Sequence, residues 1–480
     1  MTEAKKHPGG TDCVKPKVNT FILTWLLAAC SMIGPFATDM YLPSFHEMTQ
    51  VFGVPMQAVQ QTLSAYLIGF AAMTLFYGTI SDILGRKTTM VAGFFFFMLA
   101  SVGAAFSTTL AEVTFFRFVQ GLFAGCGMVI GMAVIRDLFG GPQAQKLMAY
   151  VAMVFGFGPA LAPVIGGYAA THFGWQSHFY TLAVISAFLC LACVFFLPES
   201  LPKSARTPVN FKLLAVNYAK AAANPAFMTG CSALGLAFLG QGVFIAGAAD
   251  WCVNVMGMKP DEFWHMFLPM IAGTVIGSWI SARTAQKIGT PMTIRVAFAI
   301  MALGALAALF EIVFVDQPEM PWAVLPLAVY TTGIGMMRPA MSLLLMDFYP
   351  HSRGMASSVL NFLQTLFFAL CSAFIVPFLY GDGAKYSAAI IVFSLLTMLF
   401  WAASTQLAVK APRGFKRAKR RNRLRPKRKA DGNFCRSFNG RALLAVSALI
   451  FGLDSVRGLC KMRILRRGSS SVGRAQPCQG

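Results

Sequence analysis

Twelve apolar segments, each long enough to cross a lipid bilayer as a helix, account for most of this chain. A spanning helix needs about 20 apolar residues, because only its own backbone hydrogen bonds are available inside the bilayer. Charged residues make up 12% of the 480 residues, against about 25% in soluble domains, and so few charges cannot coat a water-soluble surface. We therefore expect an all-α, multi-pass membrane protein. The segments are 20–45, 58–80, 88–107, 111–134, 148–170, 178–197, 226–249, 263–282, 291–314, 322–345, 355–379 and 386–408.

The segments form two sets of six, separated by the longest polar stretch, residues 198–225. GTISDILGRK (78–87) follows the second segment and ARTAQKIGTP (282–291) follows the eighth, so Gly85 and Gly289 correspond. Internal repeats of this kind are typical of paired transporter bundles with the substrate site between them. We predict a segment at 1–19, bundles at 20–197 and 226–409, and a cytoplasmic linker at 198–225.

Lysine and arginine predict the orientation of the chain. Cytoplasmic loops are enriched in these residues. The alternate loops hold only Lys259 and Lys385, so both termini are expected to be cytoplasmic. The basic residues of the other loops are Lys5, Lys6, Lys15, Lys17, Arg86, Lys87, Arg136, Lys146, Arg283, Lys287 and Arg353.

The net charge of +22 comes mostly from the tail, because residues 410–480 hold 20 of the 40 basic residues and 2 of the 18 acids. The polybasic stretch 410–430 directly follows the last span, where such a run attracts anionic lipid. No aromatic residues interleave the charges for base stacking, so we expect no nucleic acid partner. Residues 431–480 lose the membrane pattern and are interpreted as a disordered extension.

Several enzyme classes lack support. No GxxxxGK[ST] phosphate loop occurs, so transport would have to run on a gradient rather than on ATP. No histidine pair has ligand spacing within a span, and His172 and His178 are expected to be solvated in a loop rather than to bind a metal. Cys190 and Cys193 form a CxxC inside an apolar segment, which favours buried thiols over a redox pair. We expect a protein that is not an enzyme and holds no metal.

Three ionisable side chains lie well inside the predicted spans, namely Asp39, Arg117 and Arg338. Charges there cost at least about 2.5 kcal/mol each and are usually retained for function. By helical rise, Asp39 and Arg117 lie at similar depth, in the first and fourth segments. They are either a proton- or substrate-coupled site or a fixed ion pair that holds the first bundle together. Arg338 is either an anchor that reaches the cytoplasmic interface or a second cavity charge.

Glycine and proline mark two spans as unusual. Pro35 precedes Asp39 by about one turn and frees a backbone carbonyl, which lets the helix bend, although a passive kink is the alternative. GFGPALAPVIGG (156–167) lies inside the fifth segment, where its glycines allow close helix packing and its prolines suit a moving part.

Four motifs together resemble a known family. YGTISDILGRK (77–87) is similar to the loop signature of the major facilitator superfamily. FRFVQG (116–121) and GFGPALAPVIGG resemble motifs of its proton-coupled drug exporters. TDMYLP (38–43), with RD (136–137) and GMASS (354–358), resembles the bicyclomycin and chloramphenicol resistance branch.

The resemblance implies a major facilitator fold of twelve transmembrane helices in two pseudo-symmetric six-helix bundles. It implies a multidrug or antibiotic efflux transporter of the bacterial inner membrane that exchanges protons for amphipathic small molecules by alternating access, with no cofactor and as a monomer. Asp39 and Arg117 would couple protons, and Asp39, Tyr41, Tyr66, Arg117, Gln120 and Arg338 would line the substrate cavity. The gating latch would be Gly78, Asp82, Gly85, Arg86, Lys87 and Asp137, with Arg86 reaching Asp137. The antiporter motif would be Gly156, Gly158, Pro159, Pro163, Gly166 and Gly167.

Two other functions stay open from the sequence. One is a proton-coupled transporter of a small metabolite. The other, from a different class, is a non-transporting membrane scaffold that depends on the basic tail.

Overall fold

The computed structural model describes residues 19–139, 141–202, 204, 206, 211–315, 319–349 and 352–410. Every regular element within these ranges is helical, which confirms the predicted all-α class. The predicted tail beyond Lys410 and the segment 1–18 lie outside the described residues.

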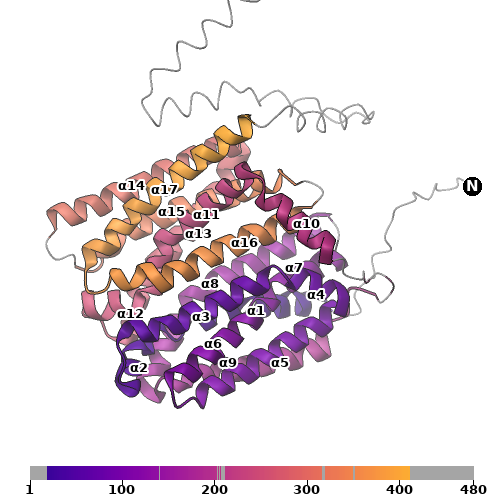
Figure 1. The fold of residues 1–480 in the computed structure, drawn as a ribbon, viewed down its shortest axis with the longest axis horizontal. Helices are drawn as coiled ribbons and strands as arrows, with labels where there is room; N and C mark the ends of the chain where they lie inside the picture. The colour runs from indigo at the N-terminus through magenta and orange to yellow at the C-terminus, as the bar shows by residue number, and fades with distance from the viewer. Residues whose placement is uncertain are drawn as a thin grey trace, which may run out of the picture. The chain divides into compact units, whose positions relative to one another are not determined.

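The first half of the chain forms the first bundle, and its long helices lie alongside one another in Figure 1. Its elements are α1 (Thr20–Asp39), η1 (Leu42–Ser44), α2 (Phe45–Phe52), α3 (Met56–Thr74), α4 (Tyr77–Leu84), α5 (Arg86–Ala105), α6 (Leu110–Ala124), α7 (Cys126–Leu138), α8 (Gly141–Phe173) and α9 (Gln176–Phe196).

The second half forms the second bundle, which follows the linker helix α10 (Phe211–Ala222). Its elements are α11 (Pro225–Ala246), α12 (Ala248–Asp250), η3 (Trp251–Val255), η4 (Pro260–Glu262), α13 (Trp264–Ile288), α14 (Thr290–Phe314), η5 (Trp322–Val324), α15 (Leu325–Met346), α16 (Arg353–Leu370), η6 (Cys371–Ile375), η7 (Val376–Phe378) and α17 (Gly383–Lys410).

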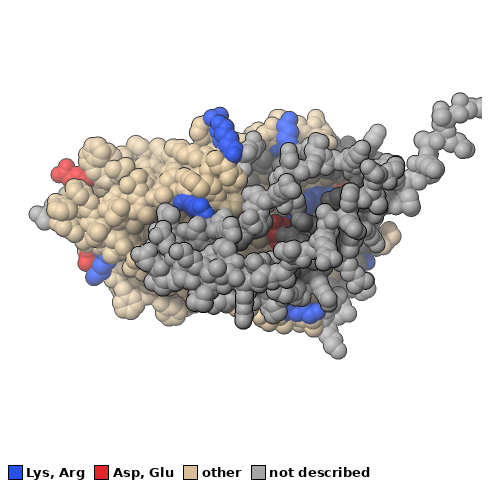
Figure 2. Space-filling model, turned by 90° about the horizontal axis from the view of Figure 1, so that it is seen from above, with Lys and Arg blue, Asp and Glu red and all other residues tan. Residues whose placement is uncertain are grey.

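Ten helices in the described ranges are long and apolar enough to cross a membrane, and the number is eleven if α3 and α4, which meet at a bend of 55°, are counted as one span. The twelfth long helix is α15, whose hydropathy is lowered by Arg338 and neighbouring polar residues. Most of the described surface in Figure 2 is uncharged, and large apolar side chains such as Phe188 and Phe195 are exposed. These features fit a multi-pass membrane protein whose apolar surface faces lipid.

The first predicted span, 20–45, is broken in the structure, because α1 ends at Asp39. The cause is Pro43, whose ring in a continuous helix would clash with the carbonyl four residues earlier, that of Asp39. The chain instead forms η1 with proline near its start. Asp39 therefore ends a helix rather than lying within one.

Two glycines confirm the predicted correspondence between the halves. Gly85 has φ of 100° and begins α5, while Gly289 has φ of 79° and begins α14. Both angles lie in the region that favours glycine, so each tight turn depends on this residue type. We name the end of the bundles that carries these two loops the latch end, and the opposite end, with loops at Gly53 and Gly381, the Gly53 end.

The two bundles contact each other at the Gly53 end. Gln60 Nε2 in α3 donates to Ser372 Oγ in η6 at 2.8 Å, and Ser64 Oγ lies 3.0 Å from the same hydroxyl. Gln61 Nε2 donates to the carbonyl of Ala373 at 3.0 Å. In addition, α8 packs against α13 and η4 of the second bundle. The start of α3 and η6 therefore join the two bundles at this end.

Candidate functional site

The guanidinium of Arg117 lies in the interior of the first bundle, with the residue 0% exposed. Its central carbon is 4.3 Å from the ring centroid of Tyr41 and 4.4 Å from that of Tyr66. Cation–π contacts of this kind are worth about 2 kcal/mol when desolvated. All three residues were predicted to line the substrate cavity, and in the structure both rings contact the guanidinium.

Close helix packing explains how Tyr66 reaches Arg117. A Cβ on Gly121 of α6 would collide with the Tyr66 carbonyl of α3, and a Cβ on Gly69 would collide with the Phe118 carbonyl. The two backbones therefore approach more closely than larger residues would allow. This approach places the Tyr66 ring against the guanidinium one turn away along α6.

Asp39 ends α1 and is buried, at 3% exposed. The Tyr66 hydroxyl donates to the Gly34 carbonyl of the same helix at 3.2 Å, five residues before Asp39. In the described part of the chain, Asp39 and Arg117 form no direct ion pair. The structure therefore does not contain the fixed ion pair that was one interpretation of the sequence, and aromatic rings surround the guanidinium instead.

Arg117 keeps unused hydrogen-bonding capacity. Its Nη1 donates to Gln120 Oε1 at 2.9 Å, and Gln120 Nε2 donates to Ser101 Oγ at 2.7 Å. Its Nε and Nη2 are buried without a hydrogen-bond partner among the described residues. A buried charge with unmade hydrogen bonds is costly. The arrangement can therefore bind a carboxylate or another acceptor that enters the bundle.

The glycines of the fifth predicted span pack α8 directly against α1. A Cβ on Gly158 would lie 2.8 Å from Pro35 Cβ, and one on Gly166 would collide with the Met40 carbonyl. A Cβ on Gly156 would meet nothing within 4 Å. Since α8 also contacts α13, it connects the neighbourhood of Asp39 with the second bundle. The other motif residues, Pro159, Pro163 and Gly167, lie along the same uninterrupted helix.

Arg338 is not part of the Arg117 cluster. It lies in α15 of the second bundle, is half-buried and is followed by Pro339. It makes no hydrogen bond or ion pair with the residues that the structure describes. Both interpretations of Arg338, an interface anchor and a second cavity charge, stay predictions.

At the latch end, the predicted contact between Arg86 and Asp137 is formed, with Nε 3.0 Å from Oδ2. Arg86 Nη2 also lies 2.6 Å from Asp82 Oδ1. Ser81 Oγ donates to the Gly78 carbonyl at 3.0 Å. This network joins the α4–α5 turn to the end of α7. By contrast, Lys87 Nζ donates to the carbonyl of Val194 at 2.7 Å and lies outside the network.

Two latch residues that follow α9, Glu199 and Ser200, were not predicted from the sequence. Glu199 Oε1 accepts the backbone amide of Arg86 at 2.9 Å, and Ser200 Oγ donates to Asp137 Oδ2 at 3.1 Å. Arg206 also contacts Glu199, at 3.4 Å. One sequence feature could have identified Glu199. It is an acid immediately after the sixth span, on the same side of the membrane spans as the latch loop.

The expectation that His178 is solvated is wrong. His178 lies in α9, is 0% exposed and pairs through Nε2 with Ser44 Oγ. The helix begins at Gln176, two residues before the predicted start, so this side chain packs in the bundle instead of the loop.

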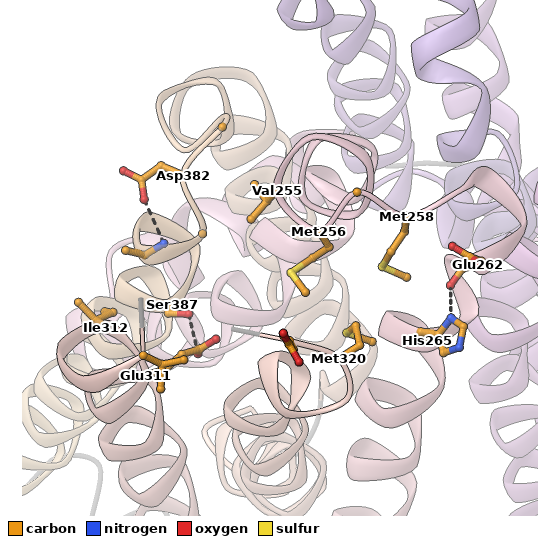
Figure 3. A pocket seen from close by; sticks show the side chains of 16 residues that line it. Val255, Met256, Met258, Glu262, His265, Glu311, Ile312, Met320, Asp382 and Ser387 are labelled. Carbon is orange, nitrogen blue, oxygen red and sulfur yellow. Dashed lines mark hydrogen bonds between the residues drawn. The ribbon is translucent and has the colours of Figure 1, made fainter. Parts of the chain in front are cut away.

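A cavity of about 910 Å³ lies at the Gly53 end of the second bundle (Figure 3). Four acidic residues and three methionines are among the residues that line it. They are Glu262, Glu311, Glu319, Asp382, Met256, Met258 and Met320. Ser387 Oγ donates to Glu311 Oε2 at 3.0 Å. None of the predicted site residues lines it, so it is separate from the Arg117 cluster.

The sequence profile of the Major Facilitator Superfamily matches residues 27–372, which include the Arg117 cluster, the latch and most of both bundles. The chain belongs to the Major Facilitator Superfamily. This membership confirms the resemblance seen in the motifs, and the helices observed fit the twelve-helix fold of the superfamily.

Two individual relatives show which branch of the superfamily the chain resembles. The chain is 30% identical to a bicyclomycin resistance protein homolog of Haemophilus influenzae, over 60% of this chain and 72% of that protein. It is 28% identical to multidrug resistance protein D of Escherichia coli, over 73% of this chain and 86% of that protein. These relatives confirm the predicted bicyclomycin resistance branch.

A solved structure supports the fold. The crystal structure of a D-xylose–proton symporter matches with a TM-score of 0.61 at 18% identity, covering 79% of this chain and 97% of that chain. At this identity the match concerns the fold alone.

Proposed function

We propose that this protein is a secondary active exporter that exchanges protons for amphipathic small molecules, including drugs or antibiotics, by alternating access. The observation that carries the proposal is the interior of the first bundle, where the Asp39 carboxyl is buried and the buried guanidinium of Arg117 keeps two unused donors. The relatives named for bicyclomycin and multidrug resistance support the substrate class.

The chemistry of coupling follows from that site. A carboxylate at Asp39 is attracted to the unused donors of Arg117, whereas a protonated Asp39 is not. A substrate donor or cation that binds the Asp39 carboxylate stabilises its charged form, so substrate binding releases the proton and protonation of Asp39 releases the substrate. Proton and substrate then displace one another, which is the requirement for exchange.

Alternating access needs helices that move against each other near this site. Two features support α8 as the moving part: its glycines pack against α1 beside Asp39, and its other face contacts α13 of the second bundle. The glycines are also explained by close packing alone, so the motion stays a proposal.

We place the protein in the bacterial inner membrane with both termini in the cytoplasm. Arginine and lysine gather in the loops of the latch end, and few lie at the Gly53 end, as the positive-inside bias requires. The Gly53 end, where hydrogen bonds from Gln60 and Gln61 join the two bundles, then faces outward. The energy source is the proton gradient without a cofactor, and the working unit is a monomer that is not an enzyme.

The test is quenching of a pH-sensitive dye in everted membrane vesicles energised by respiration. Adding a transported compound to vesicles with the wild-type protein releases protons and restores fluorescence. Asp39→Asn is expected to reduce this response to the level of vesicles without the protein, while its abundance in the membrane is unchanged. Full drug-driven proton exchange in Asp39→Asn would refute the assignment of Asp39.

The same vesicles separate the alternative functions. Symport of a metabolite moves protons and solute in one direction, so the sign of the fluorescence change is reversed. Removal of residues 411–480 leaves exchange intact if the protein is a transporter, whereas a scaffold that depends on its basic tail loses its activity.

A further inference from the structure

Asp250 is a second buried carboxylate. It lies in the second half of the chain, where no acidic residue was predicted to belong to the site. It is 2% exposed and ends α12, the short helix that continues α11 after Gly247. Asp39 likewise ends the first helix of its own bundle, at 3% exposed. Each half therefore has one buried carboxylate near the end of its first long helix.

The surroundings of Asp250 differ from those of Asp39, because Asp250 has its hydrogen bonds filled. Asn254 Nδ2 donates to Oδ1 at 2.8 Å. The backbone amide of Gly381 and the Tyr386 hydroxyl donate to Oδ2 at 2.9 Å and 3.1 Å. Three donors to one carboxylate hold it in place.

These donors connect α12 with the loop between η7 and α17. Gly381 has φ of 74°, so its amide points to Asp250 through a turn that only glycine adopts readily. The residue before it, Tyr380, donates through its hydroxyl to Gln60 Oε1 of the first bundle at 3.3 Å. Gln60 in turn donates to Ser372. Asp250 therefore holds Gly381, the neighbour of Tyr380, and the Tyr380 side chain bonds to the first bundle.

We propose that Asp250 is a positioning residue for the gate at the Gly53 end, where it holds the Tyr380–Gly381 loop so that Tyr380 bonds Gln60 and the gate stays closed. The inference rests on the proposed alternating access. It assigns the two buried carboxylates different tasks, with Asp39 at the coupling site and Asp250 at the gate.

The test measures opening of the gate without measuring transport. Leu67 lies on the same face of α3 as Gln60 and Ser64, further from the Gly53 end, and is 3% exposed. In a variant without native cysteines, Leu67→Cys reacts with a membrane-impermeant maleimide at that end only while the gate is open. The reagent is added separately to intact cells and to everted vesicles, so either orientation of the protein gives a reading.

Asp250→Asn is expected to raise the labelling rate of Leu67→Cys about tenfold, since hydrogen bonds to charged groups are lost. Tyr380→Phe is expected to raise it too, and the double variant should label no faster than the faster single variant, because both act through one contact. Glu319→Gln removes an exposed carboxylate at the same end and should leave the rate unchanged.

A labelling rate in Asp250→Asn within about twofold of the parent would overturn the inference. If Asp250→Asn fails to reach the membrane, Tyr386→Phe removes one donor to the same carboxylate, and an unchanged rate in that variant would overturn it equally. Failure of the proposed function is distinguishable, because it abolishes proton exchange in the parent while the labelling response to Asp250→Asn persists.

Discussion

The guanidinium of Arg117 lies 4.4 Å from the ring centroid of Tyr66, whose hydroxyl is bonded to the Gly34 carbonyl of α1. One aromatic side chain therefore joins the buried charge on α6 to the helix that ends in Asp39. A shift of α1 against α6 would disturb the ring and the charge together. This relationship makes the aromatic contact, and not only the two charges, a target for mutation.

Arg117→Lys is expected to reduce drug-driven proton exchange by more than tenfold. Lysine keeps the charge but loses the planar group that lies against Tyr41 and Tyr66 and the donor geometry that serves Gln120. The lost cation–π contact alone is worth about 2 kcal/mol. The measurement is initial exchange rate in everted vesicles, normalised to the amount of protein. Exchange at the wild-type rate would show that charge alone suffices.

Tyr66→Phe is expected to have a mild effect, whereas Tyr66→Leu is expected to be severe. Phenylalanine keeps the ring against Arg117 and loses one hydrogen bond, worth about 1 kcal/mol. The Gly34 carbonyl still accepts from Thr38 Oγ1 at 3.3 Å. Leucine removes the ring and exposes the guanidinium to a poorly filled space. Thermal stability of the purified variants and their exchange rates check the ranking, and equal losses in both would contradict the role of the ring.

Gly166→Ala is expected to destabilise the protein by about 1–3 kcal/mol through overpacking, because the new methyl group collides with the Met40 carbonyl. Gly156→Ala is the matched control in the same helix, since its methyl group meets nothing within 4 Å. The measurement is the unfolding temperature of each variant in detergent, taken from the loss of the size-exclusion peak after heating. Similar unfolding temperatures for both variants would mean that α8 does not pack on α1 this closely.

Much of this architecture was predictable because membrane spans follow from hydrophobic length. The correspondence of Gly85 with Gly289 was also readable, since the tight turn requires glycine in each half. Helical rise predicts a similar depth for Asp39 and Arg117, and both side chains are buried. The aromatic contacts of Arg117 could not be derived from helical rise, because they depend on the close approach of α3 and α6 at Gly121, which involves a partner helix far away in the sequence.

The missed acids have a similar explanation. Glu199 was assigned to a linker, since it follows the sixth span directly, and no local pattern shows that the chain turns back to Arg86. Asp250 fell one residue beyond the predicted seventh span, and its similarity to Asp39 is visible only when the ends of α1 and α12 are compared. Both contacts arise from tertiary packing that a single sequence does not display.

Glu199 gives the sharpest test of the latch, because its carboxylate accepts the backbone amide of Arg86 at the turn that Gly85 makes possible. Glu199→Gln keeps the shape but loses the charge, and should destabilise the latch by about 1.5–3 kcal/mol, the range for hydrogen bonds to charged groups. Asp261→Asn, an exposed acid at the Gly53 end, is the control and should leave thermal stability unchanged. If the latch holds the α4–α5 turn against the end of α9, Glu199→Gln should also increase cleavage near Gly85 by a protease added at the latch end. Equal stability and equal cleavage in the two variants would place Glu199 outside the latch and return it to the linker.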